Sequence, residues 1–176
     1  MARQDSKEAL VGRPGRLSGK SHAKAGIVVL NWARSVQAFV ESHRVARLAT
    51  VDAEGRPLVL PICYVLAGDN LYSPIDAKPK RVPVQRLKRL RNLQANPRVA
   101  LVIDDYREDW TQLAYVILHG TAEILTQGPE FDDAVGELRE KYPQYRSMPI
   151  QDNPLIAVRL MRVVSWGAVD GVSRDG

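Results

Sequence analysis

Two kinds of hydrophobic periodicity alternate along the chain, and the first of them is helical. In the stretch NWARSVQAFVESHR, residues 31–44, the apolar side chains share one helical stripe, made of Trp32, Val36, Phe39 and Val40. Asn31 precedes this stripe and belongs to a residue type that caps helix N-termini. The pattern predicts a short amphipathic helix that covers a core.

The second periodicity is that of strands. Residues 44–75, RVARLATVDAEGRPLVLPICYVLAGDNLYSPI, are rich in Val, Leu, Ile and Tyr, and the turn signals DAEG and GDN divide them into three extended runs. This pattern predicts a meander of three strands. RVALVIDD at 98–105, LAYVILHGTAEILT at 113–126 and PLIAVRLMRVVSW at 154–166 have a similar composition, and Gly120 predicts a bulge or bend.

Helical spacing returns twice between these strands. Val84, Leu87, Leu90 and Leu93 recur at helical intervals, and the NP dipeptide at 96–97 ends the pattern. In GPEFDDAVGELREKY, residues 128–142, a proline and a glutamate open the stretch as they open helices. The predicted buried face of this helix consists of Phe131, Val135, Leu138 and Tyr142.

The turns between adjacent strand runs are too short for parallel crossovers. The expected fold is therefore α+β, a six-stranded antiparallel, Greek-key-like barrel with peripheral helices. Residues 31–176 are expected to form one domain, since 176 residues with 45% hydrophobic content suit a single core. Residues 1–30 are expected to be a disordered basic arm, because residues 1–26 carry six Lys or Arg against two acids and no apolar period.

Cysteine, histidine and hydropathy exclude several classes of protein. The single cysteine, Cys63, rules out an intrachain disulfide, and three scattered histidines provide no metal cluster. No stretch approaches the roughly 18 to 20 apolar residues that a membrane span needs, and the N-terminus lacks the apolar region of a signal peptide. We therefore expect a cytoplasmic protein that binds neither a metal nor a membrane.

A strongly basic segment stands out from the mild charge of the whole chain. DAKPKRVPVQRLKRLRN, residues 76–92, has seven basic side chains and one acid, whereas the formal net charge of the chain is +5. Its helical part is expected to carry a solvated face made of Arg86, Lys88, Arg89 and Arg91. A pI near 9.5 would also suit a nucleic-acid-binding module, but residues 76–92 contain no aromatic side chain to stack on bases.

Four stretches, in this order and at these intervals, resemble one known family. They are RVARLATVDAEGRPLVLPICYVL, NLYSPIDAKPKR, RLRNLQANPRVALVIDDY and VILHGTAEIL, within residues 44–166. They are similar to the FMN-binding split barrel of the pyridoxamine 5'-phosphate oxidase-like superfamily, in the branch of probable deazaflavin (coenzyme F-420)-dependent enzymes. The resemblance implies a homodimer that holds two cofactors, FMN or coenzyme F-420, at its interface.

The resemblance also implies positions for the cofactor site. Lys78 and Lys80 stand where the family has paired phosphate-binding residues, and Arg81 follows them in a loop that leads into a helix, which suits a phosphate. Tyr72 and Ser73 match an aromatic and hydroxyl pair near the ribityl chain. The strand that lies along the ring, and whose backbone amides bond the ring edge, corresponds to Leu60, Pro61, Ile62 and Cys63. Pro61 departs from the oxidase pattern because it has no amide hydrogen to donate.

Several other residues have ordinary structural interpretations. Cys63 lies in an apolar strand, where a free cysteine is usually inert packing. His119 is expected to be a strand residue rather than a ligand. Trp110 and Trp166 are expected in the core or the dimer interface, or over the flavin of a partner chain.

The implied function is a flavin- or deazaflavin-dependent oxidoreductase that transfers a hydride between its cofactor and a small organic substrate. No constellation of acid, base or nucleophile is visible, so the catalytic residues are unassigned, which hydride transfer tolerates because the cofactor carries the chemistry. The C-terminal VVSWGAVDGVSRDG lacks the substrate motif of the true oxidases, so pyridoxamine phosphate is not the expected substrate. The alternatives are a non-catalytic flavin, deazaflavin or haem carrier or sensor of the same fold, and a nucleic-acid-binding module.

Overall fold

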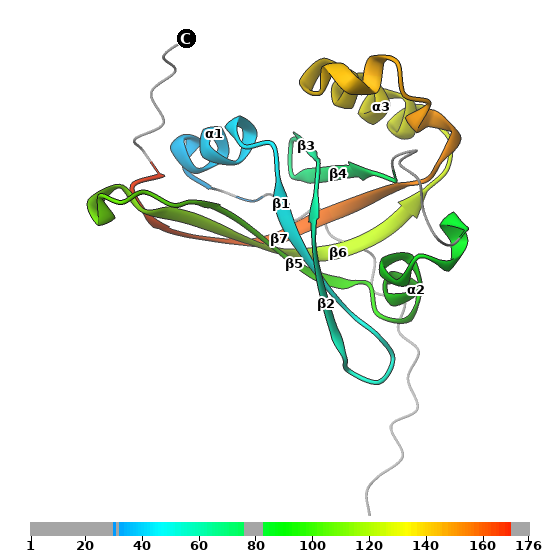
Figure 1. Cartoon of the computed structure of the whole chain (residues 1–176), viewed down its shortest axis with the longest axis horizontal. Coiled ribbons are helices and arrows are strands. Elements are labelled where there is room, and N and C mark those ends of the chain that lie inside the picture. The colour runs from blue at the N-terminus through cyan, green and yellow to red at the C-terminus, as the bar shows by residue number, and fades with distance from the viewer. Residues whose placement is uncertain (1–29, 31, 76–82, 170–176) are drawn as a thin grey trace, which may run out of the picture.

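The computed structural model describes residues 30, 32–75 and 83–169. One antiparallel sheet of seven strands, in the spatial order β2-β1-β5-β6-β7-β4-β3, forms its centre (Figure 1). The strands are β1 (Ala46–Val51), β2 (Pro57–Ile62), β3 (Val65–Ala67), β4 (Asn70–Pro74), β5 (Arg98–Asp105), β6 (Ala114–Leu125) and β7 (Leu155–Gly167). The helices are α1 (Arg34–Ser42), α2 (Lys88–Ala95) and α3 (Pro129–Lys141), with short 3-10 turns η1 (Val84–Arg86), η2 (Trp110–Gln112), η3 (Pro143–Arg146) and η4 (Ile150–Asp152).

The connection between the two edge strands closes this sheet into a barrel. β2 and β3 lie at opposite ends of the strand order, yet only Cys63 and Tyr64 separate them in the chain. Three Cα–Cα steps span at most about 11 Å, so the two edges of the sheet must come together at this link. The expected α+β antiparallel barrel with peripheral helices is confirmed.

The same link corrects the predicted strand count and the predicted meander. The second extended run breaks at Cys63 and Tyr64, which gives seven strands instead of six. β2 pairs with β1, whereas β3 pairs with β4 and β4 pairs with β7. Both halves of the run have the same composition, so periodicity alone does not reveal the corner between them.

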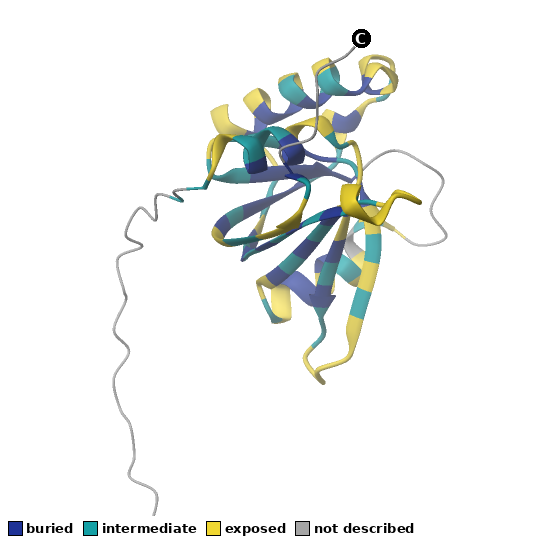
Figure 2. Ribbon diagram, turned by 90° about the vertical axis from the view of Figure 1, so that its left-hand side faces the viewer, coloured by how far each residue is buried: buried dark blue, intermediate teal, exposed yellow. Residues whose placement is uncertain are grey.

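Side chains alternate between the barrel interior and the outside, as the striped strands of Figure 2 show. The interior holds the larger core, with inward residues such as Leu48, Leu101, Leu118 and Val158. α1 and α2 pack against this core through Val36, Phe39, Val40, Leu90 and Leu93. A second core lies under α3 and contains its predicted buried face, Phe131, Val135, Leu138 and Tyr142.

Two helix predictions need correction. α1 begins at Arg34 and its N-cap is Ala33, which makes no side-chain capping bond, so Asn31 is not the cap. The basic helix is divided, because η1 is a single turn and Leu87 has extended backbone before α2 begins. The α-helical N-terminus predicted near Val84 therefore lies at Lys88.

The bulge predicted at Gly120 is confirmed. The pairing of β6 with β7 shifts between His119, which pairs with Arg162, and Gly120, which pairs with Leu160. A Cβ atom on residue 120 would lie 2.3 Å from the carbonyl oxygen of Arg159, so only glycine fits this close approach.

Within the described part of the chain, no helix is both long enough and apolar enough to cross a membrane.

Candidate functional site

The outer face of the sheet carries the strongest candidate for a ligand surface. In Figure 1, α1 and α3 lie above β5, β6 and β7, and α2 lies below the right-hand part of β6, so the rest of the lower side of these strands carries no described helix. Strand pairing sets the outward side chains in rows, of which one runs Val59, Ala49, Ala100, His119 and Arg162. The adjacent row runs Pro61, Arg47, Val102, Ile117 and Val164. We call these two rows, with Asp104, Tyr115 and Trp166 beside them, the outer face.

A shallow hollow of about 340 Å³ lies on the outer face. Its apolar floor consists of Ala49, Val59, Ala100, Val102 and Tyr115, and its remaining lining residues are Arg47 and Asp104, which form an ion pair. Ala49 pairs with Val59 on one side and with Ala100 on the other, so small side chains occupy adjacent positions. A broad, apolar floor without protruding side chains fits one face of a planar ring system.

The edge strand β2 offers this hollow few backbone donors. Asp52 and Arg56 form a hydrogen-bonded pair, since Asp52 donates its N–H to the carbonyl of Arg56. Hydrogen-bonded and non-hydrogen-bonded pairs alternate along an antiparallel ladder. Pro57 and Pro61 therefore occupy non-hydrogen-bonded positions, where the backbone groups point away from β1. Prolines are tolerated in an edge strand at such positions. Of the outward-pointing groups of β2, Val59 alone retains an N–H, while the carbonyls of residues 57, 59 and 61 all remain acceptors.

The predicted ring strand falls partly on this surface. Pro61 is exposed and pairs with Arg47 at the edge of the hollow. Leu60 and Ile62 point their side chains into the barrel core and their backbone groups toward β1, so neither presents a group to a ligand in the hollow. Cys63 is half-buried and packs against the second core under α3, as expected for a structural thiol.

Tyr72 and Ser73, predicted near the ribityl chain, are buried in β4 and do not line the hollow. The Tyr72 hydroxyl donates to Glu130 Oε1 at 2.6 Å, and Arg159 Nη1 lies 3.4 Å from the hydroxyl oxygen. Burial and the Glu130 carboxylate raise the pKa of Tyr72 to about 12. The described contacts of Tyr72 therefore belong to the packing of α3 on the sheet, and its role toward a cofactor stays a prediction.

The three predicted phosphate-binding residues, Lys78, Lys80 and Arg81, lie outside the described residues. Two described residues that flank this segment lead to a pocket of about 340 Å³ at one end of the barrel, Val84 as part of its lining and Ile75 through a hydrogen bond to the lining residue Pro154. In this bond, Ile75 donates its N–H to the carbonyl of Pro154 at 3.1 Å.

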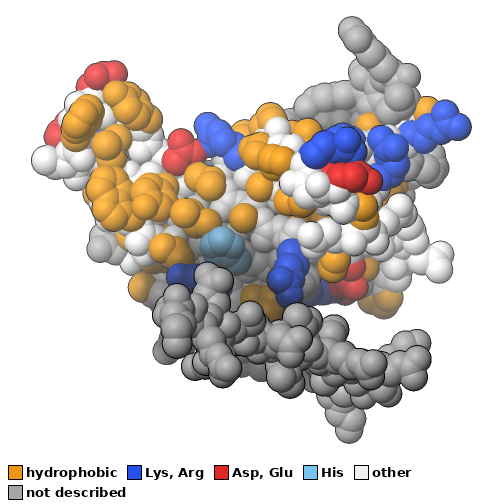
Figure 3. All heavy atoms as spheres, turned by 90° about the horizontal axis from the view of Figure 1, so that it is seen from below, with side chains coloured by type: hydrophobic (Ala, Val, Ile, Leu, Met, Phe, Trp, Pro, Cys, Tyr) orange, Lys and Arg blue, Asp and Glu red, His pale blue; other side chains and the backbone are white. Residues whose placement is uncertain are grey.

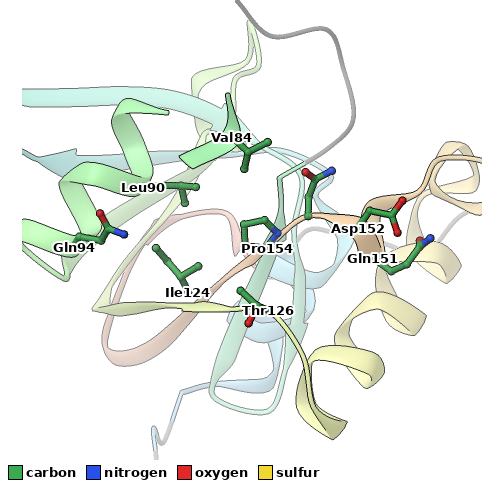
Figure 4. A pocket seen from close by; sticks show the side chains of 9 residues that line it. Val84, Leu90, Gln94, Ile124, Thr126, Gln151, Asp152 and Pro154 are labelled. Atoms are coloured by element: carbon green, nitrogen blue, oxygen red, sulfur yellow. The ribbon is translucent and has the colours of Figure 1, made fainter. Parts of the chain in front are cut away.

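Figure 4 shows the composition of this barrel-end pocket. Apolar side chains line its centre, namely Val84, Leu90, Ile124 and Pro154. Polar side chains surround them, namely Gln94, Thr126, Gln151, Asp152 and Asn153. The described lining contains no Lys or Arg, so a phosphate placed here would need cations from residues 76–82.

The link between β2 and β3 is held by buried tyrosines. Tyr64 donates its N–H to the Tyr142 hydroxyl at 2.9 Å and its own hydroxyl to the carbonyl of Val40 at 2.5 Å. The Tyr142 hydroxyl shares its one proton between the carbonyls of Arg44, at 2.7 Å, and Tyr64, at 2.8 Å. Burial raises the pKa of Tyr142 to about 12, so it remains a donor at neutral pH. The end of the candidate ring strand is thus tied to α1 and to the end of α3.

Three of the four basic residues that the sequence predicts on a solvated helix face are exposed. Arg86, Lys88 and Arg91 are exposed, and Lys88 Nζ lies 3.3 Å from Asp52 Oδ2. Arg89 is half-buried, so its predicted position on the solvated face is wrong. Arg89 lies one turn before the buried Asn92 and Leu93, so it flanks the buried side of α2.

Trp110 and Trp166, for which the sequence leaves core, interface and flavin-contacting positions open, are on the surface. Trp110 in η2 is 72% exposed, and Trp166 is 53% exposed and stacks on Tyr115 with ring centres 5.5 Å apart. This placement excludes the core interpretation for both. Figure 3 shows the molecule from below, with hydrophobic side chains gathered over one end of this face.

The floor of the hollow was not identifiable from the sequence as a ligand surface. In the sequence, nothing separates Ala49, Ala100 and Val102 from other strand residues. Their alternation with buried neighbours predicts only that they point outward. Strand pairing is what brings them together. Among the described residues, no group of three or more His, Cys, Asp or Glu side chains could hold a metal ion.

Comparisons with known proteins agree on one family and one fold. The sequence profile of the pyridoxamine 5'-phosphate oxidase family matches residues 33–167. A 5a,11a-dehydrotetracycline/5a,11a-dehydrooxytetracycline reductase from Streptomyces rimosus is 28% identical over 130 residues, which cover 73% of this chain and 78% of the reductase.

Two solved structures share the fold at low identity. An F420 reductase is 22% identical with a TM-score of 0.55, and the match covers 73% of this chain and 94% of the reductase. A heme-binding protein from Mycobacterium smegmatis is 23% identical with a TM-score of 0.62, and the match covers 80% of this chain and 54% of that protein.

Proposed function

Because the chain belongs to the pyridoxamine 5'-phosphate oxidase family, we propose that it is an oxidoreductase that binds a flavin or deazaflavin coenzyme on the outer face of its sheet. The observation that carries the proposal is the apolar hollow beside the edge strand β2, whose floor suits a planar ring. Similarity to a reductase of 28% identity, and to the fold of an F420 reductase, favours a redox function over simple binding.

In this proposal the chain contributes binding and orientation. Ala49, Val59 and Ala100 exclude water from one face of the ring, and the N–H of Val59 is a donor for the ring edge. The coenzyme, when bound, supplies hydride transfer to or from a small organic substrate, so the hollow needs no acid or base of its own.

The floor of the hollow provides a direct test. We expect Ala100→Leu to weaken the binding of both FMN and coenzyme F-420 at least about tenfold, because the added carbons fill the space against which the ring would lie. Fluorescence titration of both coenzymes measures the effect. Ala95→Leu adds the same carbons at an exposed position of α2 and is the matched control. Unchanged affinity in Ala100→Leu would place the ring elsewhere.

Lys80 tests the predicted phosphate contact. Removing a charged hydrogen bond costs about 1.5 to 3 kcal/mol, so Lys80→Ala should weaken FMN binding about ten- to a hundredfold. Riboflavin, which lacks the phosphate, should bind both proteins equally. Arg91→Ala, which removes an exposed cation of α2, is the matched control and should leave FMN affinity unchanged. Equal FMN affinity in wild type and Lys80→Ala would exclude this contact.

We also propose that the protein is a homodimer joined through the outer face. Val59, Met161 and Trp166 are each more than half exposed, as are Tyr106 and Trp110 at the end of the β5–β6 hairpin. Apolar side chains gathered on one uncovered face are typical of a protein–protein interface. A second copy would complete the enclosure of a ring that lies in the shallow hollow.

A carrier or sensor without turnover is the second candidate. Among the described residues that line the hollow, the ionisable ones are Tyr115 and the ion pair of Arg47 with Asp104. The similarity to the heme-binding protein shows that the fold is shared with a binding protein. Absorbance and mass spectrometry of the purified protein separate the two functions. A bound flavin or deazaflavin whose reduced form reoxidises with an added enone supports the enzyme, whereas a tightly held haem or an inert coenzyme supports the carrier.

A further inference from the structure

Three basic residues occupy neighbouring strands of the sheet on its uncovered side. Arg98 lies at the start of β5, His119 in the middle of β6 and Arg162 on β7. His119 pairs directly with Arg162, and Arg98 pairs with Thr121, two residues along the strand from His119. Direct cross-strand neighbours have Cβ atoms about 4.5 to 5.5 Å apart and diagonal ones about 7 to 8 Å, within reach of long side chains.

All three side chains point away from the barrel core. Arg98 precedes the buried Val99, and Arg162 precedes Val163, which packs against the core. His119 alternates with the buried Leu118 and Gly120. Arg98 and Arg162 are exposed and His119 is half-buried, so the three groups are open to a ligand from the side of the hollow.

Within the described part of the chain, no acidic side chain forms an ion pair with any of the three, a property that they share with Arg86 and Arg91 on the α2 side of the molecule. Arg47, Arg56, Lys88, Arg107 and Arg159 each form an ion pair with Asp or Glu. Arg98, His119 and Arg162 form none. An anion between the two arginines would supply the partner that the described acidic side chains do not.

The trio adjoins the hollow. Ala100, which belongs to the floor of the hollow, pairs with His119 on the neighbouring strand, and neighbouring strands lie about 4.8 Å apart. An acidic group on a molecule that lies over the hollow can therefore reach the trio. Two guanidinium groups can each donate paired hydrogen bonds to phosphate oxygens, which lysines cannot match.

We propose that Arg98, His119 and Arg162 form a subsite for the phosphate group of a small molecule bound over the hollow. None of its three residues belongs to the segment that carries Lys78, Lys80 and Arg81. A phosphate on the coenzyme itself would present the same chemistry. The assignment of the bound phosphate to a substrate therefore rests on the proposed function. The binding of a phosphate does not depend on that function.

The experiment uses the His119 ring as a local reporter in the full-length protein. Its ring proton signals are identified by NMR from their loss in His119→Gln, and inorganic pyrophosphate is then titrated in. We expect the signals to shift and saturate in wild type. In Arg98→Gln and in Arg162→Gln, the apparent dissociation constant should rise at least about tenfold, the effect of losing one charged hydrogen bond. Arg107→Gln, which removes an exposed cation already paired with Asp105, should titrate like wild type.

Each result bears on the subsite. His119 signals that do not respond to pyrophosphate, or that respond equally in all variants, overturn it. If Arg162→Gln weakens FMN but not riboflavin, the phosphate comes from the coenzyme, and if FMN affinity is unchanged, it comes from another molecule. A wild type that binds pyrophosphate through these arginines but binds neither FMN nor coenzyme F-420 leaves the subsite standing and removes the proposed function.

Discussion

At the scale of single residues, the best-defined polar contacts in the structure lie away from the hollow. Arg159 on β7 pairs with Glu123 and Glu130, and Glu130 also accepts the hydroxyl proton of Tyr72. These contacts join α3 to β4, β6 and β7. The hydrogen bonds from Arg159 hold the pKa of Glu130 below its ordinary value.

Glu130 therefore contributes stability that depends on pH. Because its pKa is lowered in the folded state, the contribution is complete above the ordinary value of 4.5 and is lost as the pH falls below it. Glu130→Gln should cost about 0.5 to 1 kcal/mol at pH 7, since the pair is partly exposed to solvent, and much less at about pH 3. Urea unfolding at both pH values measures this. Glu108→Gln, on the β5–β6 hairpin, should show no such difference, and an equal cost of Glu130→Gln at both pH values would contradict the assignment.

At the scale of elements, the sequence predicted which segments are helices and strands better than how they connect. The buried faces of α1 and α3, the strands β5, β6 and β7, and the bulge at Gly120 followed from periodicity and turn chemistry. The corner at Cys63 and Tyr64 did not, because it depends on contacts with Val40 and Tyr142, which are distant in sequence. The hollow also escaped prediction, since its floor exists only once β2, β1 and β5 lie side by side.

The corner between β2 and β3 depends on one hydroxyl group. Tyr142→Phe leaves the N–H of Tyr64 and two carbonyls without this partner in a buried position, so we expect a loss of about 1 to 3 kcal/mol in the free energy of unfolding. Chemical denaturation measures the loss. Tyr106→Phe removes a hydroxyl from a side chain that is 64% exposed and should change stability by less than about 0.5 kcal/mol. If the two variants are equally stable, the hydroxyl does not hold the corner.

At the scale of the whole molecule, the outer face determines the expected assembly. Val164 lies on β7 opposite Ile117, at the apolar end of one row of this face. In a dimer joined there, Val164→Glu would take a carboxylate out of water at an apolar contact, so the dissociation constant should rise at least about a hundredfold. Light scattering and sedimentation at micromolar concentration measure the change.

A change of charge on a different surface provides the comparison. Gln94→Glu adds a carboxylate to the exposed side of α2 and should leave the dimer intact. A wild type that is monomeric at micromolar concentration would exclude the homodimer, and a Val164→Glu protein that remains dimeric would move the interface to another face.

The position of β7 in the sheet has a consequence for synthesis on the ribosome. β4 pairs with β3 and with β7, and Pro74 meets its partner Leu155 only after the intervening residues have been made. At about 5 to 20 residues per second, this interval lasts about 4 to 16 seconds. Throughout it, the edge of β4 that later pairs with β7 is unpaired, and unpaired edges are the feature by which strands of different nascent chains associate. Translational pausing before β7 would lengthen this exposure, so the yield of folded protein should depend on codon usage in that stretch.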